Sequence, residues 1–182
     1  AAVTTGIKNT LIGGLAGDAL TDADFNVAVG QSALSADTLG SRSVAIGSSA
    51  LASQNFTSAT DAFNTAVGHV AGFAITTGTQ NTLIGGLAGD AITTGANNVA
   101  VGYLSLSANT TASDNSAFGV NALSSNTTGT TNTALGRSTL RANTTASHNT
   151  AVGYNSLTAN TTGDRGVAVG KDALLANTTG SQ

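Results

Sequence analysis

A short pattern that recurs every 17 residues constrains this chain more than any other feature of its sequence. The pattern is Asn or Ser, then Thr, Val or Ser, then Ala or Leu, then a large apolar residue and a glycine. Its glycine appears ten times, at Gly13, Gly30, Gly47, Gly68, Gly85, Gly102, Gly119, Gly136, Gly153 and Gly170. Because a constant short period is typical of a solenoid, each repeat is predicted to form one coil.

Seventeen residues are too few for a helix–turn–helix repeat but suit two short strands and two turns. In Asn149–Gly153 (NTAVG), Thr and Val alternate with Ala, which predicts a strand. A second apolar stretch follows, as at Ser156-Leu157, and it predicts the second strand. The Asn-Thr-Thr segments that begin at Asn109 and its equivalents predict turns, in which Asn and Gly take left-handed backbone angles.

Positions counted from the recurring glycine have separate characters. Position −1 is always large and apolar, and position −2 is small except at Leu11 and Leu83. Position +4 is Leu in seven repeats and glycine in three, at Gly17, Gly72 and Gly89. These three repeats carry apolar residues at +2 and +7, namely Leu15 with Leu20, Val70 with Ile75, and Leu87 with Ile92. They predict a second type of coil, in which the apolar volume has moved.

The composition favours an oligomer. The chain has no Cys, Met, Trp or Pro, only 8% of its residues are charged, and its large apolar side chains are few. A thin coil with alternating small and apolar faces would leave apolar surface exposed, and identical neighbours are the simplest cover for it. Prolines would interrupt hydrogen bonds between coils, which fits their absence.

Several classes of function are excluded or disfavoured. The net charge is −3 and the six Lys and Arg residues are scattered, which argues against nucleic acid. No apolar run approaches the roughly 18 residues that span a bilayer, so no membrane insertion by this segment is expected.

The chain does not begin with Met. We expect residues 1–182 to be one repeat array, with a four-residue insertion within residues 52–63, cut from a longer fibre.

The repeats resemble a known family. NVAVG at Asn26–Gly30, SVAIG at Ser43–Gly47, NTAVG at Asn64–Gly68 and Asn149–Gly153, and GVAVG at Gly166–Gly170 are similar to the head repeats of trimeric autotransporter adhesins. They also look like segments of bacteriophage tail fibres. The resemblance implies a left-handed parallel β-roll (a β-solenoid), a homotrimer, and an extracellular place on a cell surface or virion. It implies a structural and adhesive role, with structural glycines and no catalytic residues.

No catalytic set can be assembled from the sequence, so an enzyme is not expected and no cofactor is implied. His69 and His148 occupy different positions of the repeat, nearly five coils apart. The glycine-rich stretches 13–18 and 85–90 lack the spacing and the Lys of a phosphate-binding loop.

No metal site is expected either, although the aspartates leave calcium open as an alternative. Asp18 and Asp90 share one position of the repeat. Another four acidic residues lie loosely grouped, at Asp22, Asp24, Asp37 and Asp61. Calcium takes six to eight oxygen ligands, and the calcium-binding nonapeptide of other β-rolls is absent. Solvated turn residues explain these aspartates.

Threonines and sequons support alternative functions. Thr occupies position +8 in nine of ten repeats, and such a row of threonines suggests ice binding as an alternative function. The two threonines of each Asn-Thr-Thr segment are adjacent, so they are expected to point to opposite sides, which weakens that idea. The same segments, and Asn55-Phe56-Thr57, read as N-glycosylation acceptors, but stacked Asn side chains in a turn account for the repeated ones.

Four aromatic residues are candidates for surface contact. Phe56 and Phe63 lie in the insertion, where they either fill the space it creates or contact a receptor. Tyr103 and Tyr154 follow the recurring glycine at a variable position that is expected to face outward. The expected function is attachment of a fibre to a surface receptor such as a glycan. The alternative is an ice- or glycan-binding solenoid module.

Overall fold

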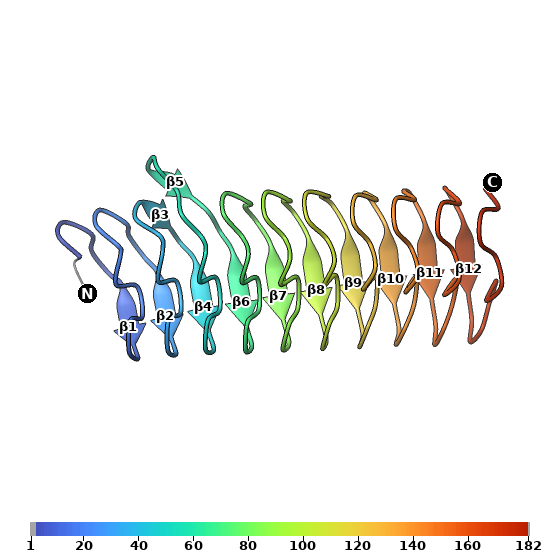
Figure 1. Ribbon diagram of the computed structural model, residues 1–182, viewed down its shortest axis with the longest axis horizontal. Helices are drawn as coiled ribbons and strands as arrows, with labels where there is room; N and C mark the ends of the chain where they lie inside the picture. Colours follow the sequence, from blue (N-terminus) through green and yellow to red (C-terminus); the bar gives the residue numbers. More distant parts are fainter. Residues whose placement is uncertain (1–2, 182) are drawn as a thin grey trace.

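A computed structural model describes residues 3–181 and shows an all-β parallel solenoid (Figure 1). One parallel sheet runs its whole length, and neighbouring strands belong to successive coils. Its ten strands are β1 (Thr10–Ile12), β2 (Val27–Val29), β4 (Val44–Ile46), β6 (Thr65–Val67), β7 (Thr82–Ile84), β8 (Val99–Val101), β9 (Ser116–Phe118), β10 (Thr133–Leu135), β11 (Thr150–Val152) and β12 (Val167–Val169). Within the described chain, no helix is long and apolar enough to cross a membrane.

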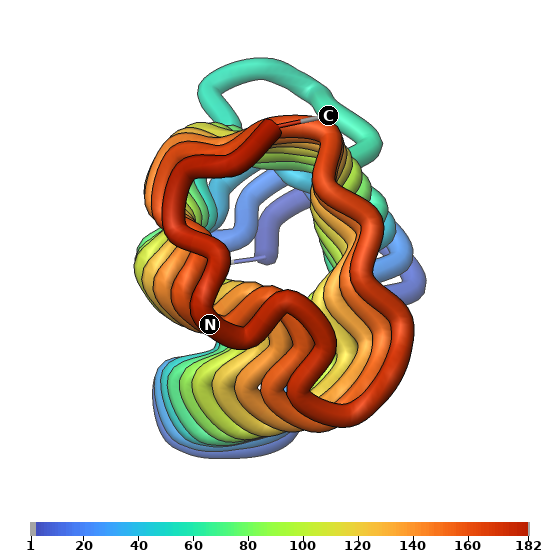
Figure 2. Tube along the Cα trace, turned by 90° about the vertical axis from the view of Figure 1, so that its right-hand side faces the viewer, coloured from blue at the N-terminus to red at the C-terminus, as the bar shows by residue number. Residues whose placement is uncertain are grey.

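The sequence period sets the register of this sheet. Ala117 pairs with Ala134 and Ala134 with Ala151, each 17 residues further along the chain. The insertion leaves the register intact, because Ala45 of β4 pairs with Ala66 of β6. The extra residues instead leave the coil between β4 and β6. This segment contains β5 (Thr60–Asp61), which pairs with β3 (Gly40–Ser41) of the preceding coil. Viewed along the axis, the coils superimpose and only this segment stands out (Figure 2).

Each strand of the ten-stranded sheet turns its middle residue inward and its other two residues outward, and the middle residue is buried in every strand except β1, where Leu11 is half-buried. The middle residue is Ala in eight strands, and these alanines are at most 3% exposed. Alternation with period 2 places the first and third residues on the opposite side, where they are half-buried or exposed. The core therefore contains the small residue of the pattern, and the large apolar residue at position −1 lies on the outside of the chain.

The second strand predicted for each coil is not formed. Leu157, expected to lie in it, has φ of 52°, and the corresponding residues of the other repeats also have positive φ. The segment after the recurring glycine is consequently a turn that points Leu into the core, where Leu157 has no exposed surface. A left-handed conformation costs a Leu residue about 1–2 kcal/mol. Burial of the whole side chain, at roughly 1.5–3 kcal/mol, offsets this cost.

This conformation explains why position +4 alternates between Leu and glycine. Gly89 has φ of 56°, and a Cβ atom there would lie 2.7 Å from Leu83 Cδ2 and 2.8 Å from Ile92 Cδ1. Leu83 and Ile92 have no exposed surface, so they fill the volume that Leu occupies in other coils. The prediction that apolar volume moves to position +7 in these coils is confirmed, because Ile92 is buried there. The prediction that it also moves to position +2 is wrong, since Leu15 at that position is 60% exposed.

Two buried ladders of Asn side chains run along the solenoid. The first ladder lies at position −4, where Asn81 Oδ1 accepts a hydrogen bond from the N–H of Asn98 at 3.0 Å. The second lies at position +7, where Asn143 Nδ2 donates to Asn126 Oδ1 at 2.8 Å. Left-handed backbone angles were expected for Asn at this second position, and that expectation is wrong, because Asn109 and its equivalents have no positive φ. Their role is to satisfy buried backbone carbonyls, as Asn126 Nδ2 does for Gly129.

Candidate interaction surfaces

The outer face of the ten-stranded sheet is uncharged along its full length, and the third residue of each strand is apolar. We define the outer face as the first and third residues of each strand, which are all Val, Thr, Ile, Leu, Phe or Ser. The most exposed of them include Ile12 at 60%, Leu135 at 48% and Val169 at 69%. Scattered apolar residues are common on protein surfaces, but a contiguous apolar stripe marks an interaction site.

A second row lies at position +1, directly after the recurring glycine. Tyr103 and Tyr154, the tyrosines expected to face outward, are 52% and 42% exposed. The guanidinium of Arg137 lies over the Tyr154 ring, 5.7 Å from its centroid. The structure therefore places both tyrosines in one surface row, three coils apart, with Arg137 at the same position of a coil between them.

The insertion separates its two phenylalanines. Phe63 is 51% exposed, whereas Phe56 is 5% exposed and lies in the interior. As a surface contact, Phe56 was wrongly predicted. Its backbone N–H donates to Asp37 Oδ1 at 3.1 Å, which draws the start of the insertion inward. The alternative in which an inserted Phe fills the space that the insertion creates holds for Phe56, and only Phe63 is available to a partner.

A buried polar network fixes the position of the insertion. Ser43 replaces Asn in the first ladder, and its shorter side chain cannot span the gap to the next coil. Gln54 bridges this gap, because its Nε2 donates to Ser43 Oγ at 3.0 Å and its Oε1 accepts from Asn64 Nδ2 at 2.9 Å. Gln54 Nε2 also donates to Asp37 Oδ2 at 2.6 Å. Gln54 and Asp37 have no exposed surface, so the network belongs to the core.

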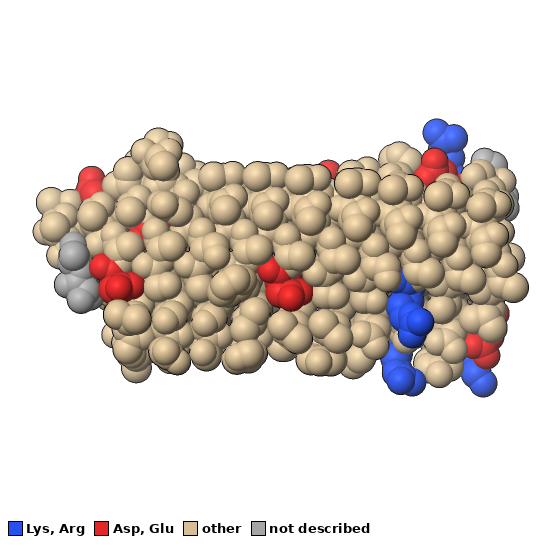
Figure 3. Space-filling view, in the orientation of Figure 1, with Lys and Arg blue, Asp and Glu red and all other residues tan. Residues whose placement is uncertain are grey.

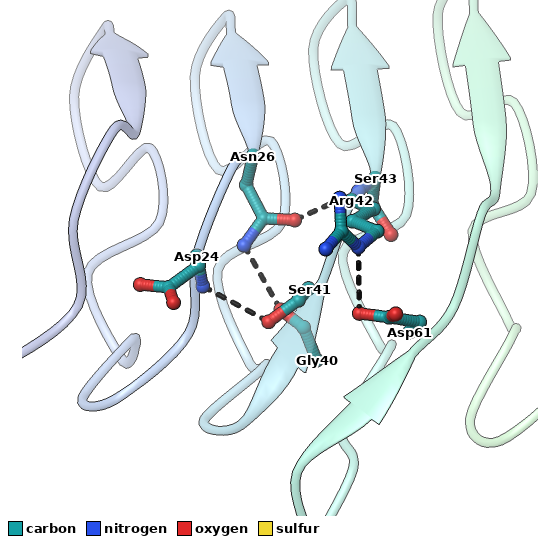
Figure 4. A network of polar contacts seen from close by, with 7 residues as sticks. All are labelled: Asp24, Asn26, Gly40, Ser41, Arg42, Ser43 and Asp61. Atoms are coloured by element: carbon teal, nitrogen blue, oxygen red, sulfur yellow. Dashed lines mark hydrogen bonds and ion pairs between the residues drawn. The ribbon is translucent and has the colours of Figure 1, made fainter.

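Above this network, Arg42 links the inserted segment to the coil. Arg42 Nε lies 2.9 Å from Asp61 Oδ1 (Figure 4). The Arg42 guanidinium is 4.8 Å from the ring centroid of Phe25 and 5.9 Å from that of Phe63. Ser41 Oγ accepts from the backbone N–H of Asp24 at 2.9 Å in the same region. Phe25 and Phe63 thus have a cation against their ring faces, which leaves less aromatic surface for a ligand.

The residues considered for catalysis and metal binding do not come together. His69 and His148 are both exposed, and His148 Nδ1 has a hydroxyl partner, Thr131 Oγ1, at 3.0 Å. Among residues 3–181, no three His, Cys, Asp or Glu side chains group as metal ligands, and no pocket is found.

The acidic residues have separate environments. Asp37 is buried in the network around Gln54, Asp61 pairs with Arg42, and Asp24 Oδ1 accepts the N–H of Ile7 at 2.7 Å. Asp22 Oδ1 accepts from Thr5 Oγ1 at 2.7 Å. These four carboxylates therefore serve the coils rather than a shared ion.

Asp18 and Asp90 sit at the same position of the two glycine-rich repeats. In each, the Oδ1 atom is buried and has no hydrogen-bond partner in the described chain. Burial raises the pKa of the Asp90 carboxyl above its usual range, and a backbone hydrogen bond partly opposes this shift. The two residues lie four coils apart, so they form no common site.

The predicted glycosylation acceptors differ in accessibility. Asn109, Asn126, Asn143 and Asn160 have no exposed surface, and their Nδ2 atoms donate to carbonyl oxygens three residues ahead. Stacking of Asn side chains in a turn, the alternative from sequence, is therefore confirmed. Asn55, in the insertion, is exposed.

The recurring glycines have the structural role expected of them. Gly85 has φ of 133°, and a Cβ atom there would lie 2.7 Å from the carbonyl carbon and oxygen of Gly102. The ten glycines all have φ between 124° and 145°. They end each strand and allow the backbones of successive coils to approach closely.

Comparisons with known proteins add no family to this description. No protein-family model matches the chain, and neither the curated proteins nor the solved structures give a match.

Proposed function

We propose that this chain is a structural and adhesive segment of a homotrimeric fibre outside the cell, on a cell surface or a virion. The observation that carries the proposal is the outer face. The outer face carries no charge, and the third residue of every strand is apolar along all ten strands, with Val169 69% exposed. Identical chains set side by side would bury this face along the whole rod.

The trimeric and left-handed form of the proposal comes from the resemblance of the repeats to autotransporter adhesin heads and phage tail fibres. In such a trimer the outer faces of three parallel chains meet around one axis. The residues that remain outside are the position +1 row, the Thr-rich turns and the inserted segment. The rod then projects a binding surface, whose exposed aromatic residues are Phe25, Phe63, Phe73, Tyr103 and Tyr154.

Particle mass and binding together test this proposal. Light scattering on the purified chain is expected to give about three chains per particle, and electron microscopy is expected to show straight rods. Beads coated with the trimer are expected to attach to a cell or glycan surface, and beads coated with a denatured sample are not. A stable monomer would contradict the fibre, and rods that attach to nothing would contradict the adhesive role.

One observation favours the alternative of an ice-binding solenoid. Seven successive repeats expose a Thr at position +9, and in six of them the small residue that follows is buried, so the residue two places on also faces outward. Thr128 and Thr130, on either side of buried Gly129, show this arrangement. Thr77 and Thr79 form the other Thr-x-Thr of this kind. Ice shaping and thermal hysteresis of the purified chain test this function, and Thr128→Lys would abolish them.

A further inference from the structure

Cationic side chains collect in the C-terminal part of the rod. Residues 1–114 contain two of the six Lys and Arg residues and seven of the nine Asp residues, a net charge of −5. Residues 115–182 contain the other four cations and two Asp residues, a net charge of +2. On the face shown in Figure 3, the Lys and Arg side chains gather near the C-terminal end. An acidic rod therefore has one basic region.

Part of this region is an ordered surface row. Arg137, Tyr154 and Lys171 occupy position +1 of three successive coils, and Arg141 lies in the same coil as Arg137. All four residues are exposed, and we call them the basic strip. At about 4.8 Å per coil, Arg137 and Lys171 are about 10 Å apart along the axis. The row continues toward the N-terminus through Val120 to exposed Tyr103.

Two guanidinium groups of the basic strip have no acidic partner. Between residues 3 and 181 the ion pairs are Arg42 with Asp61 and Lys171 with Asp172, so neither Arg137 nor Arg141 takes part in one. Arg137 is instead held over the ring of Tyr154, with Nη1 donating to the phenol oxygen at 3.5 Å. This stacking orients a planar donor group that pairs with no carboxylate between residues 3 and 181.

The chemistry of the strip matches an acidic carbohydrate. A guanidinium donates two parallel hydrogen bonds to a carboxylate, and an ammonium adds a point charge. The Tyr rings offer an apolar surface and a polar hydroxyl. A polysaccharide built of uronic acids carries both carboxylates and the apolar C–H faces of sugar rings. A nucleic acid fits less well, because its denser phosphates need more cations than three and the whole chain has a net charge of −3.

We infer that the basic strip binds polysaccharides that contain uronic acid. The inference rests on the proposed function, since it names the ligand class of the adhesive rod. A trimer would present three strips at the same height, and simultaneous binding would raise the avidity of sites that are individually weak. Exposed charge pairs are screened by salt, so binding is expected to weaken as salt concentration rises.

The test uses titration calorimetry or surface binding with an oligogalacturonate. A neutral cello-oligosaccharide of the same length and a single-stranded oligonucleotide serve as comparison ligands. The wild-type chain is expected to bind the oligogalacturonate and not the neutral sugar. Arg137→Gln with Arg141→Gln is expected to weaken binding by about tenfold. Lys8→Gln with Arg165→Gln removes the same charge outside the strip and is expected to leave binding unchanged.

Three results would overturn the inference: no binding of the oligogalacturonate, equal weakening by both double variants, or tighter binding of the oligonucleotide. Particle mass is measured on the same samples. A trimer that binds no oligogalacturonate would overturn the ligand assignment and leave the fibre proposal standing. A monomer whose binding depends on Arg137 and Arg141 would overturn the fibre proposal and leave the ligand assignment standing.

Discussion

Asn98 is tied to the coil before it by one acceptor atom. Asn81 Oδ1 accepts from the backbone N–H of Asn98 at 3.0 Å and from its Nδ2 at 3.1 Å. Nδ2 of Asn98 also donates to the carbonyl of Ala112 at 2.9 Å, and its Oδ1 accepts the N–H of Asn115 at 3.1 Å. Because Asn98 has no exposed surface, water cannot replace any of these partners.

Asn98→Ala is therefore expected to lower the free energy of unfolding by about 2 kcal/mol, since it leaves the buried N–H of Asn115 without its acceptor and removes one of the two donors to the carbonyl of Ala112. Thr94→Ala, at an exposed position of the same coil, is the matched control and is expected to change stability by less than about 0.5 kcal/mol. Denaturant unfolding followed by circular dichroism measures both. A similar loss in the two variants would mean that the ladder carries no special share of stability.

The second prediction concerns the space beside Gly89. Gly89→Leu places the usual Leu of position +4 against Leu83 and Ile92, and overpacking is expected to cost about 1–3 kcal/mol. In a Leu83→Ala background the same change is expected to cost less, because the side chain that blocks the space is gone. A double-mutant cycle gives the coupling between the two sites. Additive effects would refute the account of the two coil types.

The third prediction concerns pH. Burial raises the pKa of Asp90, so between the ordinary and the raised pKa the folded chain binds more protons than the unfolded chain. The free energy of unfolding then falls as pH rises through this window, and the whole loss is present once the pH lies above the raised pKa.

Replacement of Asp90 by Ser, the residue found at the same position in the next coil, is expected to stabilise the fold at neutral pH. The gain is expected to shrink at a pH well below the ordinary pKa of Asp, where the carboxyl is neutral in both states. Urea unfolding at the two pH values measures this difference. Destabilisation by Asp90→Ser at neutral pH would show that the carboxylate has a favourable partner.

The period of the sequence was sufficient to predict the coils and the register of the main sheet. Each recurring glycine ends a strand, and the insertion leaves the pairing of Ala45 with Ala66 unchanged. The second strand could not be predicted correctly, because Leu157 takes a left-handed conformation that its side chain disfavours. Burial in the core outweighs that local preference.

The candidate surfaces were predicted less completely. Tyr103 and Tyr154 were expected to face outward and do so. Sequence could not distinguish Phe56 from Phe63, since both lie in the insertion and only the hydrogen bond to Asp37 draws Phe56 inward. The pairing of Arg137 with Tyr154 was also missed, although their 17-residue spacing was visible and predicts contact between adjacent coils.

The central claim, that three chains assemble through the outer face, is tested most directly by the particle mass of a variant that carries a charge on this face. Val152 is the third residue of β11 and points outward, so Val152→Asp leaves the core of each chain intact. It would place three carboxylates together where the chains meet, whereas Lys171→Ala changes only the exposed position +1 row. Sedimentation equilibrium is predicted to give single chains for Val152→Asp and three chains for Lys171→Ala, both with the wild-type circular dichroism spectrum. The same mass for both variants would contradict the outer face as the site of assembly.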